Sequence, residues 1–96
     1  MNEYERVIKE RLKTYTIHDF VFPLHFYRKA KGKRDVHELE IAKLLEQENI
    51  LRIEPGHSGK TVVYIKHSPN YVTKAVLLFT DKIIVVTAYR YPARLL

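Results

Sequence analysis

The sequence predicts an α+β fold, in which two or three N-terminal helices pack on a four-stranded antiparallel sheet. Two observations support this prediction. Before residue 50, apolar residues recur at the three- and four-residue spacing of helices, over residues 3–14 and 36–48. After residue 50, short runs rich in β-branched residues alternate with turn residues. The chain has 96 residues, the size of one domain, so we predict a single domain over residues 1–96.

The first helix is predicted over residues 3–14. Asn2 and Glu5 have the spacing of a capping box, and five apolar or aromatic residues lie on one helical face: Tyr4, Val7, Ile8, Leu12 and Tyr15. The next segment has two interpretations. Phe20–Phe22 favours a short strand, whereas Pro23 is also suited to begin a helix that ends at Gly32.

The second half of the chain is predicted to form the remaining helix and the sheet. The spacing of Asp35 and Glu38 again fits a capping box, and an apolar stripe follows it over residues 36–48. Four strands are then predicted, separated by turns that contain Pro55-Gly56, Pro69-Asn70 and Asp81: Ile50–Ile53, Thr61–His67, Ala75–Phe79 and Ile83–Tyr89. The last two strands are apolar on both faces, so we expect them to be central and covered by the helices.

Charge is unevenly distributed along the chain. Seventeen Lys and Arg residues outnumber eleven Asp and Glu residues, for a formal charge of +6. Residues 1–21 are neutral, 22–34 carry +5, 35–54 carry −4 and 55–96 carry +5. Two basic blocks favour a polyanionic partner, and we expect RNA rather than DNA, although a solvated surface would give the same composition. The predicted nucleic-acid-binding residues are Lys29, Lys31, Lys33, Arg34, Lys60, Lys66 and His67.

Several classes of site are not supported. The absence of cysteine excludes disulfides, thiolate zinc sites and a cysteine nucleophile. Gly59-Lys60-Thr61 resembles the end of a phosphate-binding loop, but Glu54 replaces the required glycine and strand-like sequence follows. The five histidines lack metal-binding spacing, so no metal or cofactor is expected. No signal peptide or membrane-spanning run is visible, which favours a cytoplasmic protein.

One group of residues has the composition of a catalytic site. His25 and Arg28 fall in the early segment, and Thr87, Tyr89 and Arg90 fall near the end of the last strand. If the early helix crosses the sheet, an imidazole, guanidinium groups and a phenol would line one cleft. These groups suffice for metal-free RNA cleavage, which needs a base, an acid and cations on the phosphate. In the alternative interpretation, the tyrosines cover the edge of the core and the bases are solvated.

This layout resembles the small ribonuclease fold shared by barnase, colicin-type nucleases and RelE-type toxins. The resemblance rests on Leu24–Lys29, Lys33-Arg34, Ile41–Leu45 and the final strand Ile83–Arg90. It implies a toxin-type, metal-independent endoribonuclease inhibited by an acidic antitoxin. His25 would be the acid or base, Arg28 and Arg90 would hold the phosphate, and Tyr89 and Thr87 would donate hydrogen bonds to it.

Two other functions remain open. The first is a noncatalytic nucleic-acid-binding or regulatory module that uses residues 28–34 and the Lys60, Lys66 and Lys74 surface. A winged-helix form of this module would combine the helix ending at Glu48 with a wing around Lys60, but that helix is acidic and two additional strands follow. The second is a protein–protein adaptor of phage or host type that uses the acidic residues 35–54.

Overall fold

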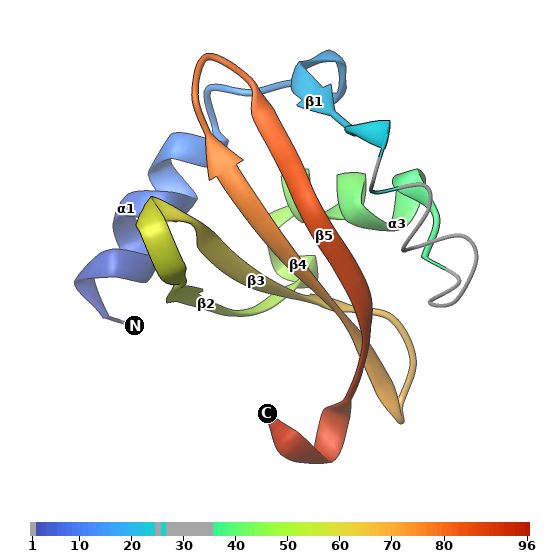
Figure 1. Cartoon of the computed structure of the whole chain (residues 1–96). Coiled ribbons are helices and arrows are strands. Elements are labelled where there is room, and N and C mark those ends of the chain that lie inside the picture. Colours follow the sequence, from blue (N-terminus) through green and yellow to red (C-terminus); the bar gives the residue numbers. More distant parts are fainter. Residues whose placement is uncertain (1, 25, 27–35) are drawn as a thin grey trace.

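The computed structural model describes residues 2–24, 26 and 36–96, and it confirms the α+β class (Figure 1). The bounds of the helices and strands are α1 Glu3–Leu12, β1 Phe20–Val21, α3 Glu38–Ala42, β2 Ile50–Pro55, β3 Thr61–Lys66, β4 Tyr71–Phe79 and β5 Ile83–Pro92. Short 3-10 turns η1, η3, η4, η5 and η6 span Ile17–Asp19, Lys43–Leu45, Gln47–Asn49, His57–Gly59 and Ala93–Leu95.

The sheet differs from the predicted one in its number of strands and their directions. In the described part of the chain it has five strands in the order β1-β5-β4-β3-β2. Neighbours are antiparallel except β1 and β5, which pair in parallel with Phe20 opposite Ile83. The prediction of a four-stranded antiparallel sheet was therefore wrong. A two-residue strand is too short to show a period-2 pattern, and its partner lies more than sixty residues away in the sequence.

α1 follows the prediction closely. The Asn2 side chain accepts a hydrogen bond from the Glu5 amide at 2.8 Å, which satisfies one of the free N–H groups of the first turn. The helix ends at Leu12, two residues before the predicted end, and Ile8 and Leu12 are buried. The apolar face of α1 therefore packs into the core as its spacing indicated.

The predicted helix over residues 36–48 is interrupted. α3 has only five residues, and its cap is His37, whose Nδ1 accepts a hydrogen bond from the Leu39 amide at 3.1 Å. The chain then continues as η3 and η4, with extended backbone at Glu46. Ile41 and Leu44 are nevertheless fully buried, because residues three apart lie on the same side of a 3-10 turn as well as of an α-helix. The apolar stripe predicted burial correctly but could not show the type of helix.

The two faces of the sheet have different neighbours. Ile8 and Leu12 of α1 pack with Ile41, Leu44 and the inward side chains of β2–β5 in one apolar core. The other face, called the outer face below, carries a smaller cluster around Val62, Tyr64 and Val72, joined by Val76, Tyr91 and Ala93. This second cluster explains why β4 and β5 are apolar on both faces, although α1 and α3 pack on only one of them.

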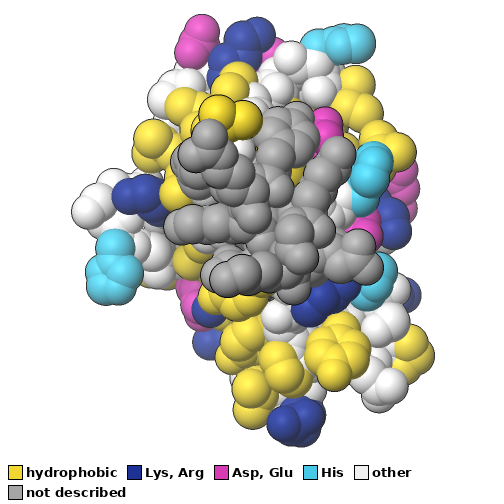
Figure 2. Space-filling view, turned by 45° about the vertical axis from the view of Figure 1, so that its right-hand side comes forward, with side chains coloured by type: hydrophobic (Ala, Val, Ile, Leu, Met, Phe, Trp, Pro, Cys, Tyr) yellow, Lys and Arg dark blue, Asp and Glu magenta, His cyan; other side chains and the backbone are white. Residues whose placement is uncertain are grey.

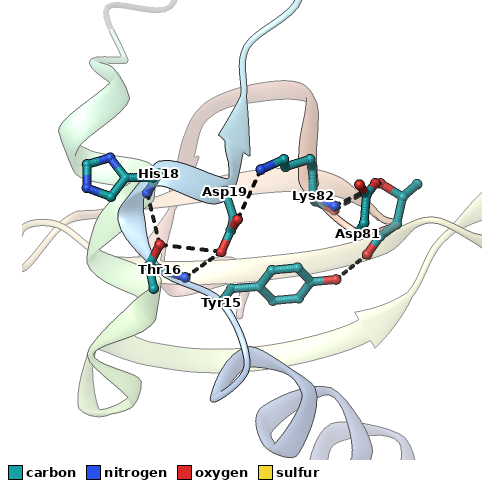
Figure 3. A network of polar contacts seen from close by, with 7 residues as sticks. Tyr15, Thr16, His18, Asp19, Asp81 and Lys82 are labelled. Atoms are coloured by element: carbon teal, nitrogen blue, oxygen red, sulfur yellow. Dashed lines mark hydrogen bonds and ion pairs between the residues drawn. The ribbon is translucent and has the colours of Figure 1, made fainter.

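A polar network holds β1 beside the start of β5 (Figure 3). Asp19 accepts a hydrogen bond from the Thr16 amide at 2.8 Å and pairs with Lys82 at 3.3 Å. Tyr15 donates a hydrogen bond to the carbonyl of Thr80 in the β4–β5 turn. The Thr16 amide, aided by Lys82, lowers the pKa of Asp19. The His18 ring points away from the Asp19 carboxylate in Figure 3, so this network has the geometry of a structural anchor.

Candidate nucleic-acid interface

A row of polar and aromatic side chains crosses the outer face. The strand register places Arg52 opposite Tyr64, Tyr64 opposite Lys74, and Lys74 opposite Tyr89. Side chains alternate between the two faces of a strand, so these four residues project from the same face of β2, β3, β4 and β5. Lys66 and Tyr91 lie two residues beyond Tyr64 and Tyr89, and therefore extend the same face.

Lys74 occupies the centre of this row, with its ammonium group among three tyrosine rings. The Lys74 Nζ atom lies 5.0 Å from the ring centroid of Tyr91, 5.5 Å from that of Tyr64 and 5.6 Å from that of Tyr89. Cations within about 6 Å of an aromatic face are attracted by the electrons of the ring. Burial would lower the pKa of Lys74, but the Tyr89 and Tyr64 hydroxyl groups outweigh that effect and raise it. Lys74 is therefore positively charged at neutral pH.

Tyr64 forms a buried support for this cluster. Its side chain is only 4% exposed, and its hydroxyl group donates a hydrogen bond to Glu54 at 2.8 Å. Arg52 pairs with the same carboxylate at 3.0 Å, and its guanidinium carbon lies 5.7 Å from the Tyr64 ring centroid. Tyr91 packs edge-on against Tyr64 with the ring centroids 5.3 Å apart.

Several cations and aromatic rings of this face reach solvent. Arg52 and Lys66 are exposed, while Lys74, Tyr89 and Tyr91 are half-buried. Glu54 is the acid that the register places among the bases Arg52, Lys66 and Lys74. The described part of the outer face is therefore positively charged, with aromatic surface beside the charges.

The structure separates the residues predicted to form the catalytic group. Thr87 and Tyr89 share the outer face, but Arg90 lies opposite Thr73 on the face that packs against the helices. There, Arg90 Nη2 donates to Glu40 Oε1 at 2.9 Å and Nη1 donates to the Thr73 hydroxyl at 3.0 Å. His25 and Arg28, like the predicted RNA-binding residues Lys29, Lys31, Lys33 and Arg34, lie outside the described residues, so their roles stay predictions.

Arg90 also determines the ionisation of Glu40. Burial would raise the pKa of Glu40, but the hydrogen bonds and charge of Arg90 together outweigh that effect and lower it, with a smaller contribution from the charge of His67. Glu40 is therefore ionised at neutral pH. Arg90, Glu40 and His67 thus form an electrostatically coupled group at the side of the sheet that packs against α3.

The other predicted basic residues lie in two places. Lys66 and His67 line a cavity of about 410 Å³ together with Lys43, Glu46 and Asn49. Lys60 ends the Gly-rich β2–β3 turn, where its carbonyl accepts a hydrogen bond from the Gly56 amide at 2.8 Å. As the sequence indicated, this turn is part of a hairpin and β3 follows it, so it lacks the helix that a phosphate-binding loop requires.

Sequence reasoning did not single out Arg52, Tyr64 or Lys43. The alternating pairs Tyr64/Lys66 and Tyr89/Tyr91 were the available signal for the outer face, because residues two apart share one face of a strand. Lys43 gave no such signal, since its position beside Lys66 depends on how η3 packs against the end of β3. Tyr71, Leu95 and Leu96 are exposed. Figure 2 shows hydrophobic side chains gathered at the lower end of that view.

Residues 2–24, 26 and 36–96 hold no group of three or more side chains able to bind a metal ion. Over the same residues, no helix combines the length and apolar character needed to cross a bilayer. Comparison with protein-family models, curated proteins and solved structures returned no match. The resemblance to small ribonucleases therefore stays a prediction.

Proposed function

We propose that the protein is a single-stranded RNA-binding domain that uses the outer face of its sheet. One observation carries the proposal: the Lys74 ammonium group lies among three tyrosine rings on the face opposite the main core. Proteins that bind single strands combine cations, which neutralise phosphates, with aromatic rings, on which unpaired bases stack. Tyr89 and Tyr91 supply half-buried rings, and Arg52, Lys66 and Lys74 supply the charge.

The contacts within the cluster also favour a binding surface. Tyr64 is held by Glu54, and Tyr91 packs on Tyr64, so the rings are already oriented before a ligand arrives. Preorganised rings reduce the conformational entropy lost on binding. Bases can then stack on the exposed parts of Tyr89 and Tyr91, while Lys74 and Arg52 contact the phosphates beside them.

The test is binding of an oligouridylate of about 10 nucleotides, measured by fluorescence anisotropy over a range of salt concentrations. The variant Arg52→Gln/Lys74→Gln removes two charges from the outer face. The control Arg6→Gln/Lys13→Gln removes two exposed charges from α1 and its C-terminal end. Two lost single-strand contacts should reduce the slope of log K against log salt by about 1.4 in the outer-face variant only. Equal losses in both variants would contradict a defined interface.

A metal-independent ribonuclease is the second candidate, and one observation favours it. Glu40, Arg90 and His67 supply an ionised carboxylate, a guanidinium group and an imidazole that interact electrostatically. A carboxylate can take the 2′-hydroxyl proton, an imidazolium can protonate the leaving oxygen, and a guanidinium can stabilise the phosphate. In the folded protein, however, Arg90 is engaged by Glu40, so RNA would have to compete for it.

Incubation of RNA with the purified protein in EDTA separates the two candidates. The RNA-binding proposal predicts intact RNA at stoichiometric protein. Cleavage that disappears in both His67→Ala and Glu40→Gln would support the ribonuclease instead, and loss of cleavage in His25→Ala would point to the site predicted from the sequence. An acidic protein partner that covers the same basic surface is expected from the resemblance and is proposed on that ground alone.

A further inference from the structure

The cavity at the end of β3 gathers basic side chains from separate parts of the chain. Lys43 comes from η3, Lys66 ends β3 and His67 begins the β3–β4 turn, and together with Glu46 and Asn49 they line a space of about 410 Å³. Asn49 is fixed there, because its side-chain amide donates a hydrogen bond to the Lys43 carbonyl at 3.1 Å. The cavity is therefore formed by side chains that folding brings together.

The two lysines of this cavity have no ion-pair partner among the described residues. Arg6, Lys9, Lys13, Arg52, Lys82 and Arg90 each pair with a carboxylate. Lys43 and Lys66 make no such pair with residues 2–24, 26 or 36–96, although Glu46 also lines the cavity. Two ammonium groups against one carboxylate leave the lining with a net positive charge, which favours an anionic ligand.

We propose that this cavity holds a phosphate group of the RNA strand that binds the outer face. Lys66 joins the two surfaces, because it lines the cavity and also lies on the same face of β3 as Tyr64. The half-buried rings of Tyr89 and Tyr91 lie on β5, which only β4 separates from β3, a distance of about 10 Å across the sheet. An RNA strand of a few nucleotides that stacks on these rings can therefore extend across the sheet to Lys66 and the cavity. This inference rests on the proposed function and assigns it a second, separate subsite.

The variant Lys43→Gln tests the subsite, because Lys43 lines the cavity and is not part of the outer face, whereas Lys66 belongs to both. Lys13→Gln is the charge-matched control, and circular dichroism checks folding. Each phosphate contact on a single strand contributes a slope of about −0.7, equivalent to about eightfold in affinity at about 50 mM salt. Loss of one contact should therefore weaken binding by about eightfold in Lys43→Gln and leave Lys13→Gln within about twofold. Glu46→Gln should tighten binding, because it removes the negative charge of the cavity.

Two forms of the oligouridylate identify the source of the phosphate. If Lys43→Gln loses the same affinity for the 5′-hydroxyl and 5′-phosphorylated forms, the cavity holds an internal phosphodiester. If it loses affinity for the phosphorylated form alone, the cavity holds the terminal phosphate. Equal affinities of Lys43→Gln and Lys13→Gln, with Arg52→Gln/Lys74→Gln still weakened, would overturn this inference and leave the proposed function intact. If the unaltered protein binds no RNA, both are overturned.

Discussion

The Glu40–Arg90 pair gives the sharpest prediction about stability. Glu40→Gln keeps the shape of the side chain but removes its charge, leaving the guanidinium group of Arg90 without its anionic partner. The two side chains are 20% and 24% exposed, so the pair is only partly desolvated. Hydrogen bonds to charged groups contribute about 1.5–3 kcal/mol, and residual exposure places the loss near the lower limit, at about 1.5 kcal/mol. For a domain of this size, that loss lowers Tm by about 6–12 °C.

Urea unfolding at neutral pH measures this loss, and a double-mutant cycle isolates the pair. We expect Glu40→Gln and Arg90→Gln together to destabilise less than the sum of their separate effects, with a coupling energy of about 1 kcal/mol. The pKa of Glu40 is lowered in the folded protein, so its stabilisation is complete above the unfolded value of 4.5 and is lost as pH falls through the folded value. Strictly additive effects of the two substitutions would refute this account of Arg90. The account would also be refuted if the stability of Glu40→Gln fell on acidification as much as that of the wild type.

Three further variants test the fold. Leu44→Ala, at a fully buried position, should cost about 2–5 kcal/mol in urea unfolding, and a loss below about 1 kcal/mol would show that Leu44 is not in the core. Gly59→Ala should lower the free energy of unfolding by about 1 kcal/mol in the same assay, because Gly59 has a φ of 76°, which is unfavourable for alanine. The added Cβ would meet nothing within 4 Å, so no clash contributes to this loss. An unchanged free energy of unfolding would contradict the turn conformation. The ionised carboxylate of Asp19 stabilises the wild type at neutral pH, and this stabilisation is lost as pH falls through the lowered pKa of Asp19. Asp19→Asn should therefore unfold at a lower temperature than the wild type at neutral pH, and the difference should disappear on acidification. Identical thermal denaturation curves of the two proteins from neutral to acidic pH would contradict the anchor.

The sequence predicted the parts of the fold that depend on local pattern. The cap at Asn2, the apolar faces of α1 and α3, and the hairpins of β2–β5 all follow from spacing within about ten residues. One interpretation of the sequence placed a short strand at Phe20–Phe22, and β1 forms there. Its parallel pairing with β5 was not predicted, because that pairing joins segments more than sixty residues apart. The length of α3 was also missed, since burial of Ile41 and Leu44 is compatible with either helical form.

The candidate site shows the same division. Adjacent residues of a strand point to opposite faces of a sheet, so Tyr89 and Arg90 of β5 do not share one face, although both were predicted from the sequence to line one cleft. The sequence alone could not show which face of the sheet carries the binding residues. That depends on the register between strands, which places Lys74 between Tyr64 and Tyr89. The pairing of Arg90 with Glu40 joins residues fifty positions apart and had no local signal.

The most direct test of the outer-face proposal is a backbone and side-chain NMR titration of the full chain with the oligouridylate. Residues of the outer face, above all Arg52, Lys74 and Tyr91, should shift most, and the resonances of α1 should remain in place. Shifts centred on α1 and α3, or no shifts at low salt, would contradict the assignment of RNA binding to this face.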